Sequence, residues 1–358
     1  MIENAQTPRG ATIRTAIVGY GLSGSVFHVP FLEEHPDFTV SAIVTSDDTR
    51  RSQAAAKHPD AQIYRTFDEL ESQSGPLDLI VLASPPDTHV DLALRSLRLG
   101  AAVVLDKPFV SSVAEAHGLI SAAAHATKPL MVFQNRRWDG DFLTVRSLIE
   151  SGRLGRVFHF ESNFEHWAPE VTSGWKDHLP TSSAGGVAFD LGSHLVDQAL
   201  VLFGPALSVS SRLRTVREGG GNDDHAEIHL EHESGTVSRL LMSRVSHGQG
   251  PRFRVLGTKG SFISYGLDPQ EPALADGARP GDPGFGTVPS ELYGTLIEDT
   301  ANGPLTTRVP TEPGDYAEFY RRAAAAVRGV APEPVPTAQA VAVVDVLERA
   351  THPQRRES

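Results

Sequence analysis

The residue whose position most clearly suggests chemistry is Lys107, which follows the apolar run 101–105 and Asp106 and precedes Pro108. The run is short and wholly apolar, which is typical of a strand buried on both faces of a parallel sheet. Ligands of open α/β sheets bind at the carboxyl ends of such strands. The sequence therefore predicts a functional lysine at a strand end, with an ordinary solvent-facing lysine as the alternative.

A second set of titratable residues lies in the segment 185–203, which begins with two glycines and is predicted to open a helix. Asp190 and His194 are four residues apart, so on one helix they share a face, and Asp197 continues it. A histidine oriented by a carboxylate is a competent general acid or base near neutral pH. We therefore expect Asp190 and His194 to be catalytic; a structural pair is the alternative, and no third ligand supports a metal site.

A Gly-x-Gly-x-x-Gly pattern directly follows the first apolar run and opens a helical segment. The first glycine allows a tight turn, the second lets the backbone approach a pyrophosphate, and the third permits close helix–strand packing. Backbone N–H groups at the start of the helix then bind phosphate. The residues expected to bind a dinucleotide here are Gly19, Gly21, Leu22, Ser23 and Gly24; a glycine-rich turn without a ligand is the alternative.

The choice between NAD and NADP depends on the end of the second strand. Thr45 and Ser46 are small and hydroxylated where NAD-binding proteins usually carry an acid, and Arg50 and Arg51 follow. This pattern suits a ribose 2′-phosphate, so it favours NADP. Asp47 leaves NAD open, because it is near enough in sequence to serve as the acid.

Further cofactor contacts are expected at the ends of the next two strands. The run 83–89 contains two prolines that stiffen a turn where the nicotinamide half should pass, although Asp87 or Thr88 could simply cap a helix there. The residues expected to contact the cofactor from these strand ends are Ser84, Pro85, Pro86, His89, Asp106 and Lys107.

The elements that must position these residues change in kind along the chain. Strands alternate with helical patterns up to residue 133, which predicts a doubly wound parallel (Rossmann) sheet in a domain over 12–133. Consecutive strand-like runs then predict an α+β domain over 134–330 with a large, mostly antiparallel open sheet. The proline-rich stretch 267–290 is predicted to be a loop, and 331–358 to carry a helix that packs back on the body.

Composition limits the possible partners. The chain has 358 residues, with 32 basic against 44 acidic side chains and a net charge of −12, which disfavours binding to nucleic acid or to anionic membranes. It has no cysteine, which excludes disulfides and thiolate chemistry. There is no long apolar run, and residues 1–10 are polar without the apolar core of a signal peptide. We therefore expect a cytoplasmic protein.

Together these motifs resemble the Gfo/Idh/MocA family (glucose–fructose oxidoreductase, inositol dehydrogenase, rhizopine catabolism) over nearly the whole chain. The family's Glu-Lys-Pro appears as 106–108 with a shorter carboxylate, and its Gly-Gly…Asp-x-Gly-x-His-x-x-Asp appears at 185–197; His28 and 134–138 also look like family features. The resemblance implies hydride transfer between NAD(P) and a ring hydroxyl or ketone of a sugar, inositol or related polyol. It also implies a homodimer or homotetramer formed through the open sheet face.

Within this chemistry, His194 is the expected base, Asp190 orients it, and Lys107 polarises the hydroxyl, although Lys107 itself could take the proton. Trp175 and Lys176 are expected to cover the cofactor. The residues expected to contact substrate are Asn135, Arg136, His166 and His178. Two other functions stay open: redox-assisted cleavage of a sugar with recycled cofactor, and a non-catalytic dinucleotide sensor, which should have lost the lysine or the histidine.

Overall fold

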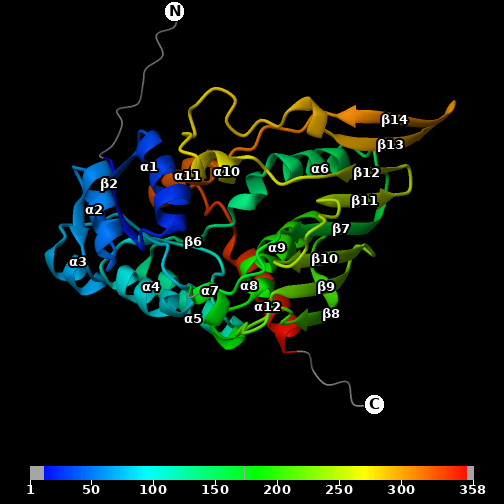
Figure 1. The fold of residues 1–358 in the computed structure, drawn as a ribbon. Helices are drawn as coiled ribbons and strands as arrows, with labels where there is room; N and C mark the ends of the chain where they lie inside the picture. Colours follow the sequence, from blue (N-terminus) through cyan, green and yellow to red (C-terminus); the bar gives the residue numbers. More distant parts are fainter. Residues whose placement is uncertain (1–11, 173, 353–358) are drawn as a thin grey trace, which may run out of the picture.

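The structure is a computed structural model that describes residues 12–172 and 174–352, so the polar residues 1–10 lie outside the described part. The first part of the chain forms a six-stranded sheet, parallel throughout, in the order β3-β2-β1-β4-β5-β6 (Figure 1). Its strands are β1 (Ile13–Val18), β2 (Phe38–Val44), β3 (Gln62–Tyr64), β4 (Leu79–Leu82), β5 (Ala102–Leu105) and β6 (Leu130–Val132). The order confirms the predicted doubly wound sheet and puts its switch point between β1 and β4.

Helices cover both faces of this sheet, as connections between parallel strands require. They are the π-helical turn η1 (Ser23–His28), α1 (Val29–Glu34), α2 (Asp48–Lys57), α3 (Phe67–Gln73), the 3₁₀ turn η2 (Pro86–Thr88), α4 (His89–Arg98) and α5 (Val113–Ala126). Asp47, Thr66 and Ser112 cap α2, α3 and α5 by accepting a backbone N–H with their side chains. The short elements β3 and α3 were not predicted from the sequence.

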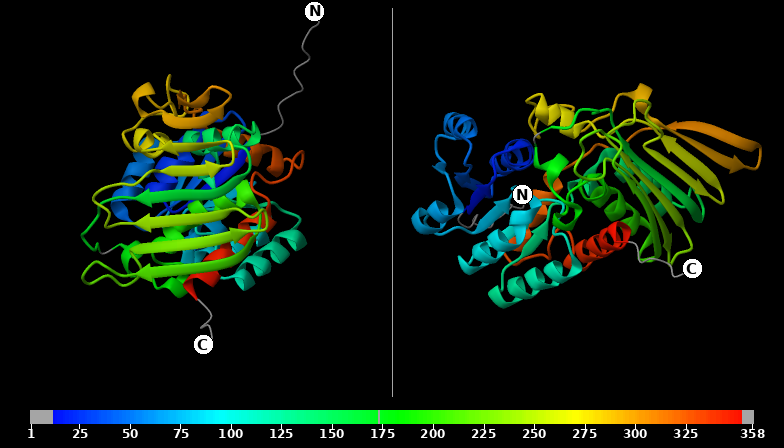
Figure 2. Two further views of the ribbon diagram at one scale, coloured as in Figure 1. Left: turned by 90° about the vertical axis from the view of Figure 1, so that its right-hand side faces the viewer. Right: turned by 60° about the horizontal axis from the view of Figure 1, so that its bottom comes forward.

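The second sheet has eight strands in the order β14-β13-β12-β11-β7-β10-β9-β8. Its strands are β7 (Val157–Glu165), β8 (Ala206–Arg214), β9 (His225–His232), β10 (Val237–Ser243), β11 (Phe253–Gly257), β12 (Gly260–Ser264), β13 (Gly294–Thr300) and β14 (Gly303–Val309). All its pairs are antiparallel except β7 with β10, which confirms the mostly antiparallel prediction. Figure 2 (left) shows one face of this sheet with no helix in front of it.

The remaining helices connect the sheets or cover the inner face of the second one (Figure 1). They are η3 (Asn135–Trp138), α6 (Gly140–Glu150), α7 (Trp175–His178), η4 (Thr181–Ser183), α8 (Val187–Asp190), α9 (Gly192–Phe203), α10 (Gln270–Ala275), η5 (Ser290–Leu292), α11 (Ala317–Val327) and α12 (Thr337–Thr351). The predicted loop 267–290 therefore contains the short helix α10. The β13–β14 hairpin, also missed by the prediction, extends the second sheet outward (Figure 2, right).

Two hydrophobic cores divide the buried side chains, and the division does not follow chain order. One core belongs to the first sheet, and the other lies between the second sheet and helices α6 and α9. Helix α11 falls within the predicted second domain, yet its Phe319 and Tyr320 are fully buried in the first core. Helix α12 contributes Ala340 and Val344 to the first core and Val343 and Leu347 to the second, so it joins the two halves.

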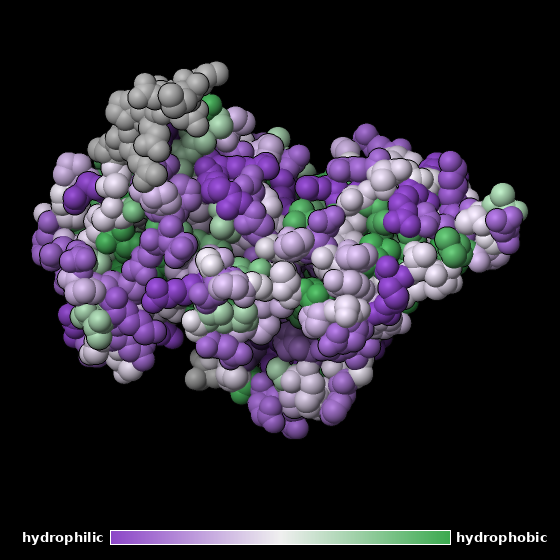
Figure 3. Space-filling view, turned by 90° about the horizontal axis from the view of Figure 1, so that it is seen from above, coloured by the Kyte–Doolittle hydropathy of each residue, from purple (hydrophilic) through white to green (hydrophobic). Residues whose placement is uncertain are grey.

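The surface seen from above is mostly hydrophilic, with hydrophobic residues in separate small areas (Figure 3). No single helix in the described ranges is long and apolar enough to cross a membrane. The bent pair Thr181–Asp190 and Gly192–Phe203 passes that test by length and composition alone.

Candidate active site

Lys107 lies at the carboxyl end of β5 and contacts a residue 83 positions further along the chain. Its Nζ donates hydrogen bonds to the Asp190 carbonyl oxygen at 2.8 Å and to Asp190 Oδ1 at 2.9 Å. The lysine side chain is 17% exposed and the aspartate side chain 8%. Burial lowers the pKa of Lys107 against the opposing charge of Asp190. The structure thus brings two of the three predicted catalytic residues into direct contact.

Asp190 binds two more cations. Lys176 Nζ lies 3.1 Å from Oδ1 and 3.2 Å from Oδ2, and Arg244 Nη2 donates to Oδ2 at 2.7 Å. Burial alone would raise the pKa of Asp190, but the charges of Lys107, Lys176 and Arg244 hold it well below its usual range. Asp190 is therefore a carboxylate that fixes three basic side chains, and Lys176 adopts a position next to Lys107.

The local backbone explains why Asp190 faces Lys107. Gly186 has φ +92°, and a Cβ there would lie 1.9 Å from Asp223 Oδ1, so only glycine fits. Asp223 Oδ2 accepts the Ala188 N–H at 2.8 Å and so holds the first turn of α8. Helix α8 then ends at Asp190, and the 69° bend before α9 turns the chain away. The predicted single helix is thus two helices.

This bend overturns one expected interaction. His194 is buried on α9, its Nδ1 has no hydrogen-bond partner among the described residues, and the Asp190 oxygens bind Lys107, Lys176 and Arg244 instead. The i,i+4 argument fails because the two residues belong to different helices. Burial, followed by the charges of Lys107 and Arg136, holds the pKa of His194 well below its usual range. His194 is therefore a neutral imidazole near neutral pH.

Asp197, which was expected to continue the catalytic face, has another partner. Its two carboxylate oxygens accept hydrogen bonds from Arg137 Nε at 2.8 Å and Arg137 Nη2 at 2.6 Å, and both side chains are buried. This bidentate pair ties α9 to the turn η3.

Asp106 does not bind the ammonium of its neighbour Lys107. One oxygen accepts the Lys107 backbone N–H at 2.7 Å, and the other accepts the hydroxyl of Ser23 from the glycine loop. His28 Nε2 lies 3.7 Å from the same oxygen, and the Tyr320 hydroxyl contacts His28 Nδ1 at 2.6 Å. Burial would raise the pKa of Asp106, but His28, Lys107 and Ser23 together lower it to about 2. Asp106 therefore joins the lysine backbone to the glycine loop.

The glycine loop has the shape that a dinucleotide requires. Gly19 has φ +99°, and a Cβ there would lie 2.5 Å from the Ala83 oxygen; a Cβ on Gly24 would lie 2.0 Å from the Gly19 oxygen. At Gly21 the nearest atom to a Cβ is Arg50 Nη1 at 3.6 Å, so the backbone is open on that side. A pyrophosphate can therefore approach the backbone at Gly21.

The residues at the end of β2 are those expected to contact the adenosine ribose of the cofactor. Asp47 Oδ1 caps α2 by accepting the Arg50 backbone N–H at 2.8 Å, and Asp48 Oδ1 binds Arg51 Nη1 at 3.1 Å. Thr45 is buried, whereas Ser46 is exposed. Asp47 thus uses one carboxylate oxygen as a helix cap, and its other oxygen, the hydroxyls of Thr45 and Ser46 and the Arg50 guanidinium are the polar groups at this strand end.

The strand end after β4 has a firmly held turn. Ser84 Oγ and Thr88 Oγ1 are 2.6 Å apart, and Thr88 Oγ1 donates to the Pro85 carbonyl at 2.7 Å. His89 is fully buried, with its two ring nitrogens each 3.0 Å from the backbone oxygens of Phe109 and Ser84. His89 therefore braces the loops after β4 and β5, and the expected direct contact with a cofactor does not fit its position.

The residues expected to bind substrate differ in their burial and their contacts. Arg136 is buried over the Phe164 ring at 4.8 Å and pairs with Asp139 and Glu271, and its charge acts on His194. Asn135 is buried in the same turn. His166 is half-buried, and burial followed by the charge of Arg244 lowers its pKa.

The remaining predicted site residues all lie on α7: Trp175 and Lys176, expected to cover the cofactor, and His178, expected to contact substrate. Trp175 is exposed and has Lys176 Nζ 5.7 Å from its ring centre, whereas His178 is exposed beside Gly221. Only Lys176 of this helix binds Asp190, so the structure gives His178 no contact with the carboxylate.

Arg244 was missed at the sequence level, although a signal for it exists. It directly follows β10, and Lys107 similarly follows β5 by two residues. A strand in a sheet predicted to be antiparallel gives no reason to expect a ligand at its end, because that rule applies to open parallel α/β sheets. The contact between His28 and Tyr320 joins residues 292 positions apart, so no short stretch of sequence could predict it.

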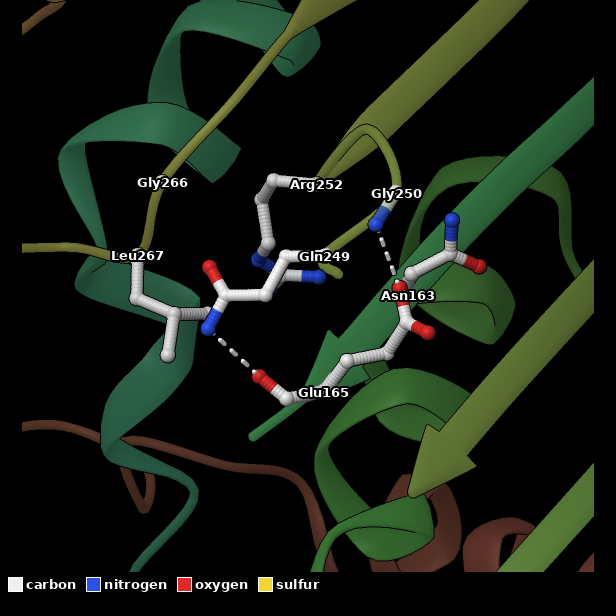
Figure 4. A pocket seen from close by; sticks show the side chains of 7 residues that line it. All are labelled: Asn163, Glu165, Gln249, Gly250, Arg252, Gly266 and Leu267. Carbon is white, nitrogen blue, oxygen red and sulfur yellow. Dashed lines mark hydrogen bonds between the residues drawn. The ribbon is translucent and has the colours of Figure 1, made fainter. Parts of the chain in front are cut away.

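A separate hollow lies at the end of β7 (Figure 4). It is lined by Asn163, Glu165, Gln249, Gly250, Arg252, Gly266 and Leu267. Glu165 accepts hydrogen bonds from the backbone of Gly250 and, through its own carbonyl, from Gln249. Because neither Lys107 nor Asp190 lines it, this hollow is distinct from the candidate active site.

The parallel sheet order, the glycine loop and the strand-end lysine define a dinucleotide-binding oxidoreductase. Two family models match the chain: an oxidoreductase family with an NAD-binding Rossmann fold over residues 13–134, and a GFO/IDH/MocA C-terminal domain over residues 142–263. The chain belongs to the Gfo/Idh/MocA family, and it is an enzyme that acts as a nicotinamide-dependent dehydrogenase or reductase on CH–OH groups.

Similar proteins cover nearly the whole chain. An uncharacterised oxidoreductase of Schizosaccharomyces pombe is 37% identical over 94% of this chain and 96% of its own. The scyllo-inositol 2-dehydrogenase (NADP(+)) of Bacillus subtilis is 33% identical over 95% of this chain and 93% of its own. A solved structure of a Bacillus subtilis oxidoreductase superposes with a TM-score of 0.89 at 32% identity, covering 95% of each chain.

Proposed function

We propose that this enzyme oxidises a ring hydroxyl of a sugar, inositol or related polyol, or reduces the matching ketone, with NADP as its preferred cofactor. The observation that carries the proposal is the contact of Lys107 with Asp190 at the carboxyl end of β5, next to a buried neutral His194. The inositol and NADP(+) named for the Bacillus subtilis relative support it. The Arg50 side chain beside Gly21 supports NADP independently.

The glycine loop, Ser84 and the residues at the end of β2 would hold the dinucleotide, which when bound supplies the hydride acceptor for oxidation. Lys107 takes the hydroxyl proton in this proposal, because its pKa is lowered from a high ordinary value toward neutral pH. Burial and the charge of Lys107 lower the pKa of His194, which weakens it as a base. It instead accepts a hydrogen bond and orients the reacting hydroxyl.

Asp190 positions Lys107 rather than His194. Its two hydrogen bonds from the ammonium fix Nζ, while Asp106 fixes the lysine backbone through its N–H. The lysine is thus held at both ends, which keeps its nitrogen in a single place for proton transfer. Asn135, Arg136 and His166 are proposed to line the substrate side.

The oligomeric state and the cellular location of the enzyme are also proposals. A homodimer or homotetramer through the uncovered face of the second sheet would bury a surface that no helix covers (Figure 2). The net charge of −12 supports the absence of nucleic-acid and membrane partners and a cytoplasmic location.

The direct test is a panel of sugars, inositols and sugar acids, with nicotinamide absorbance followed for NAD and NADP separately. We expect net reduction of the cofactor by at least one polyol and a higher kcat/KM with NADP. Tightly held cofactor that cycles without net reduction would contradict the proposal and favour redox-assisted cleavage.

A further inference from the structure

Cations outnumber carboxylates in the ion pairs that join Asp190 to its neighbours. The joined ion pairs contain four cations, Lys107, Lys176, Arg244 and Arg217, and three carboxylates, Asp190, Asp177 and Asp224. The three carboxylates are at most 8% exposed. With Lys107 protonated, one positive charge is therefore left without a partner within this cluster, and the half-exposed Lys176 is the cation most open to a further anion.

Hydrogen-bonding capacity shows the same imbalance. Each oxygen of Asp190 already accepts two hydrogen bonds: Oδ1 from Lys107 and Lys176, and Oδ2 from Lys176 and Arg244. A carboxylate offers about four acceptor sites, so Asp190 has none to spare. Donors remain, because the Lys176 side chain is 45% exposed and Arg244 Nε has no partner among the described residues. A ligand here must bring acceptors.

Three side chains from different elements meet on this side of Asp190. Strands β7 and β10 are parallel neighbours with Glu165 opposite Ser243, so His166 and Arg244 leave the sheet at the same end. Lys176 reaches the same carboxylate from α7. Arg244 is itself held in place by Asp177, which accepts from its Nη1 at 3.0 Å. This Lys176–Arg244–His166 cluster thus places two cations and one imidazole beside Lys107.

We propose that the Lys176–Arg244–His166 cluster binds a carboxylate of the substrate, so that the enzyme acts on sugar acids in preference to neutral sugars. A carboxylate is an anion that only accepts hydrogen bonds, so it matches both the unpaired charge and the spare donors. A neutral hydroxymethyl group would bring a proton for which Asp190 has no acceptor left. The inference rests on the proposed function, since it names the substrate class of the same site.

The test compares pairs of sugars that differ only at C6. D-Glucuronate with D-glucose, D-galacturonate with D-galactose, and D-mannuronate with D-mannose are assayed for NADP and NAD reduction alongside inositols. We expect at least one acid to exceed its neutral partner in kcat/KM by about tenfold or more, the size of one hydrogen bond to a charged group. Equal or better turnover of neutral sugars or inositols would overturn the inference and leave the proposed function intact.

Variants then locate the effect. Lys176→Gln should lower the acid-to-neutral ratio of kcat/KM about tenfold, Lys176→Arg should retain it, and Lys259→Gln, at an exposed lysine on the β11–β12 turn, should leave it unchanged. Binding of the preferred acid to the enzyme–NADPH complex, followed by its thermal shift, should weaken in parallel. If Lys176→Gln instead weakens NADPH binding at an unchanged ratio, the anion is a cofactor phosphate and the inference fails. Turnover of no compound in the panel would refute the proposed function itself.

Discussion

Replacing Lys107 is the most direct test of the proposed chemistry, because the loss of its hydrogen bonds to Asp190 and the loss of proton transfer have different expected effects. In Lys107→Met, Asp190 keeps Lys176 and Arg244 on its carboxylate and loses the lysine from Oδ1 and from its carbonyl. We expect a loss of stability of about 1–3 kcal/mol, the range for a hydrogen bond to a charged group. Turnover should fall by about 10²–10⁴-fold, the usual contribution of a positioned acid or base, which corresponds to about 3–5 kcal/mol in the activation barrier.

The assay follows nicotinamide absorbance under saturating cofactor, with NADPH fluorescence reporting cofactor binding and thermal melts reporting the fold. Lys57→Met, at an exposed lysine on α2, is the matched control. Lys107→Arg separates charge from proton transfer, because arginine keeps the positive charge but does not release its proton. The reasoning is refuted if Lys107→Met turns over within tenfold of the parent, or if Lys107→Arg is fully active.

Three further predictions follow from contacts in the same region. In the oxidation direction kcat/KM should rise with pH, because deprotonated Lys107 is the reactive form. The inflection should fall between about 6.5 and 10.4, the ordinary pKa values of histidine and lysine. An inflection below 6.5 that disappears in His194→Asn would show that the histidine is the base. Arg50→Met should raise KM for NADP about 10–100-fold and KM for NAD much less, because a charge-assisted hydrogen bond is lost. Arg98→Met, at an exposed arginine at the end of α4, is the control and should change neither KM. Equal effects of Arg50→Met on both cofactors, or a similar effect of Arg98→Met, would contradict the assignment. The pKa of Asp106 is about 2 in the folded enzyme and about 3.9 when unfolded. Asp106 should therefore stabilise the fold by about 2–3 kcal/mol above pH 4 and lose this contribution as the pH falls toward 2. Urea melts of Asp106→Asn should show a lower free energy of unfolding than the parent at pH 7 and a smaller difference at acid pH; a difference that stays constant would disprove it.

The sequence could predict those features that depend on local pattern. The apolar runs of β1, β2, β4 and β5 and the glycine loop are contiguous signals, so the parallel sheet and the place of Lys107 follow from them. The resemblance also places Lys107 and Asp190 in one site, but their direct contact was not predicted. Helix α3 and strand β3 were missed because a three-residue edge strand and a seven-residue helix show too little periodicity.

What failed depends on geometry that no short window contains. The bend at Leu191 separates Asp190 from His194, and the helix before the bend is held by a hydrogen bond from the Ala188 N–H to Asp223, 35 positions further along the chain. Without that contact, one continuous helix is the reasonable prediction. Arg244 enters the site because β10 pairs in parallel with β7, an exception within an otherwise antiparallel sheet. Pairing partners across long separations were not available from a single sequence.

The placement of α11 has a consequence for how the chain acquires its structure. Phe319 packs edge-on against Phe133, nearly 190 residues earlier. Tyr320 lies tilted against the same ring and also stacks on Phe31. A ribosome-bound chain that ends before α11 therefore exposes aromatic side chains of its first core, even though every strand of the first sheet has already been made. The nucleotide-binding half should thus finish folding only after synthesis is nearly complete, and until then its unpaired aromatic surface is available to chaperones or to aggregation.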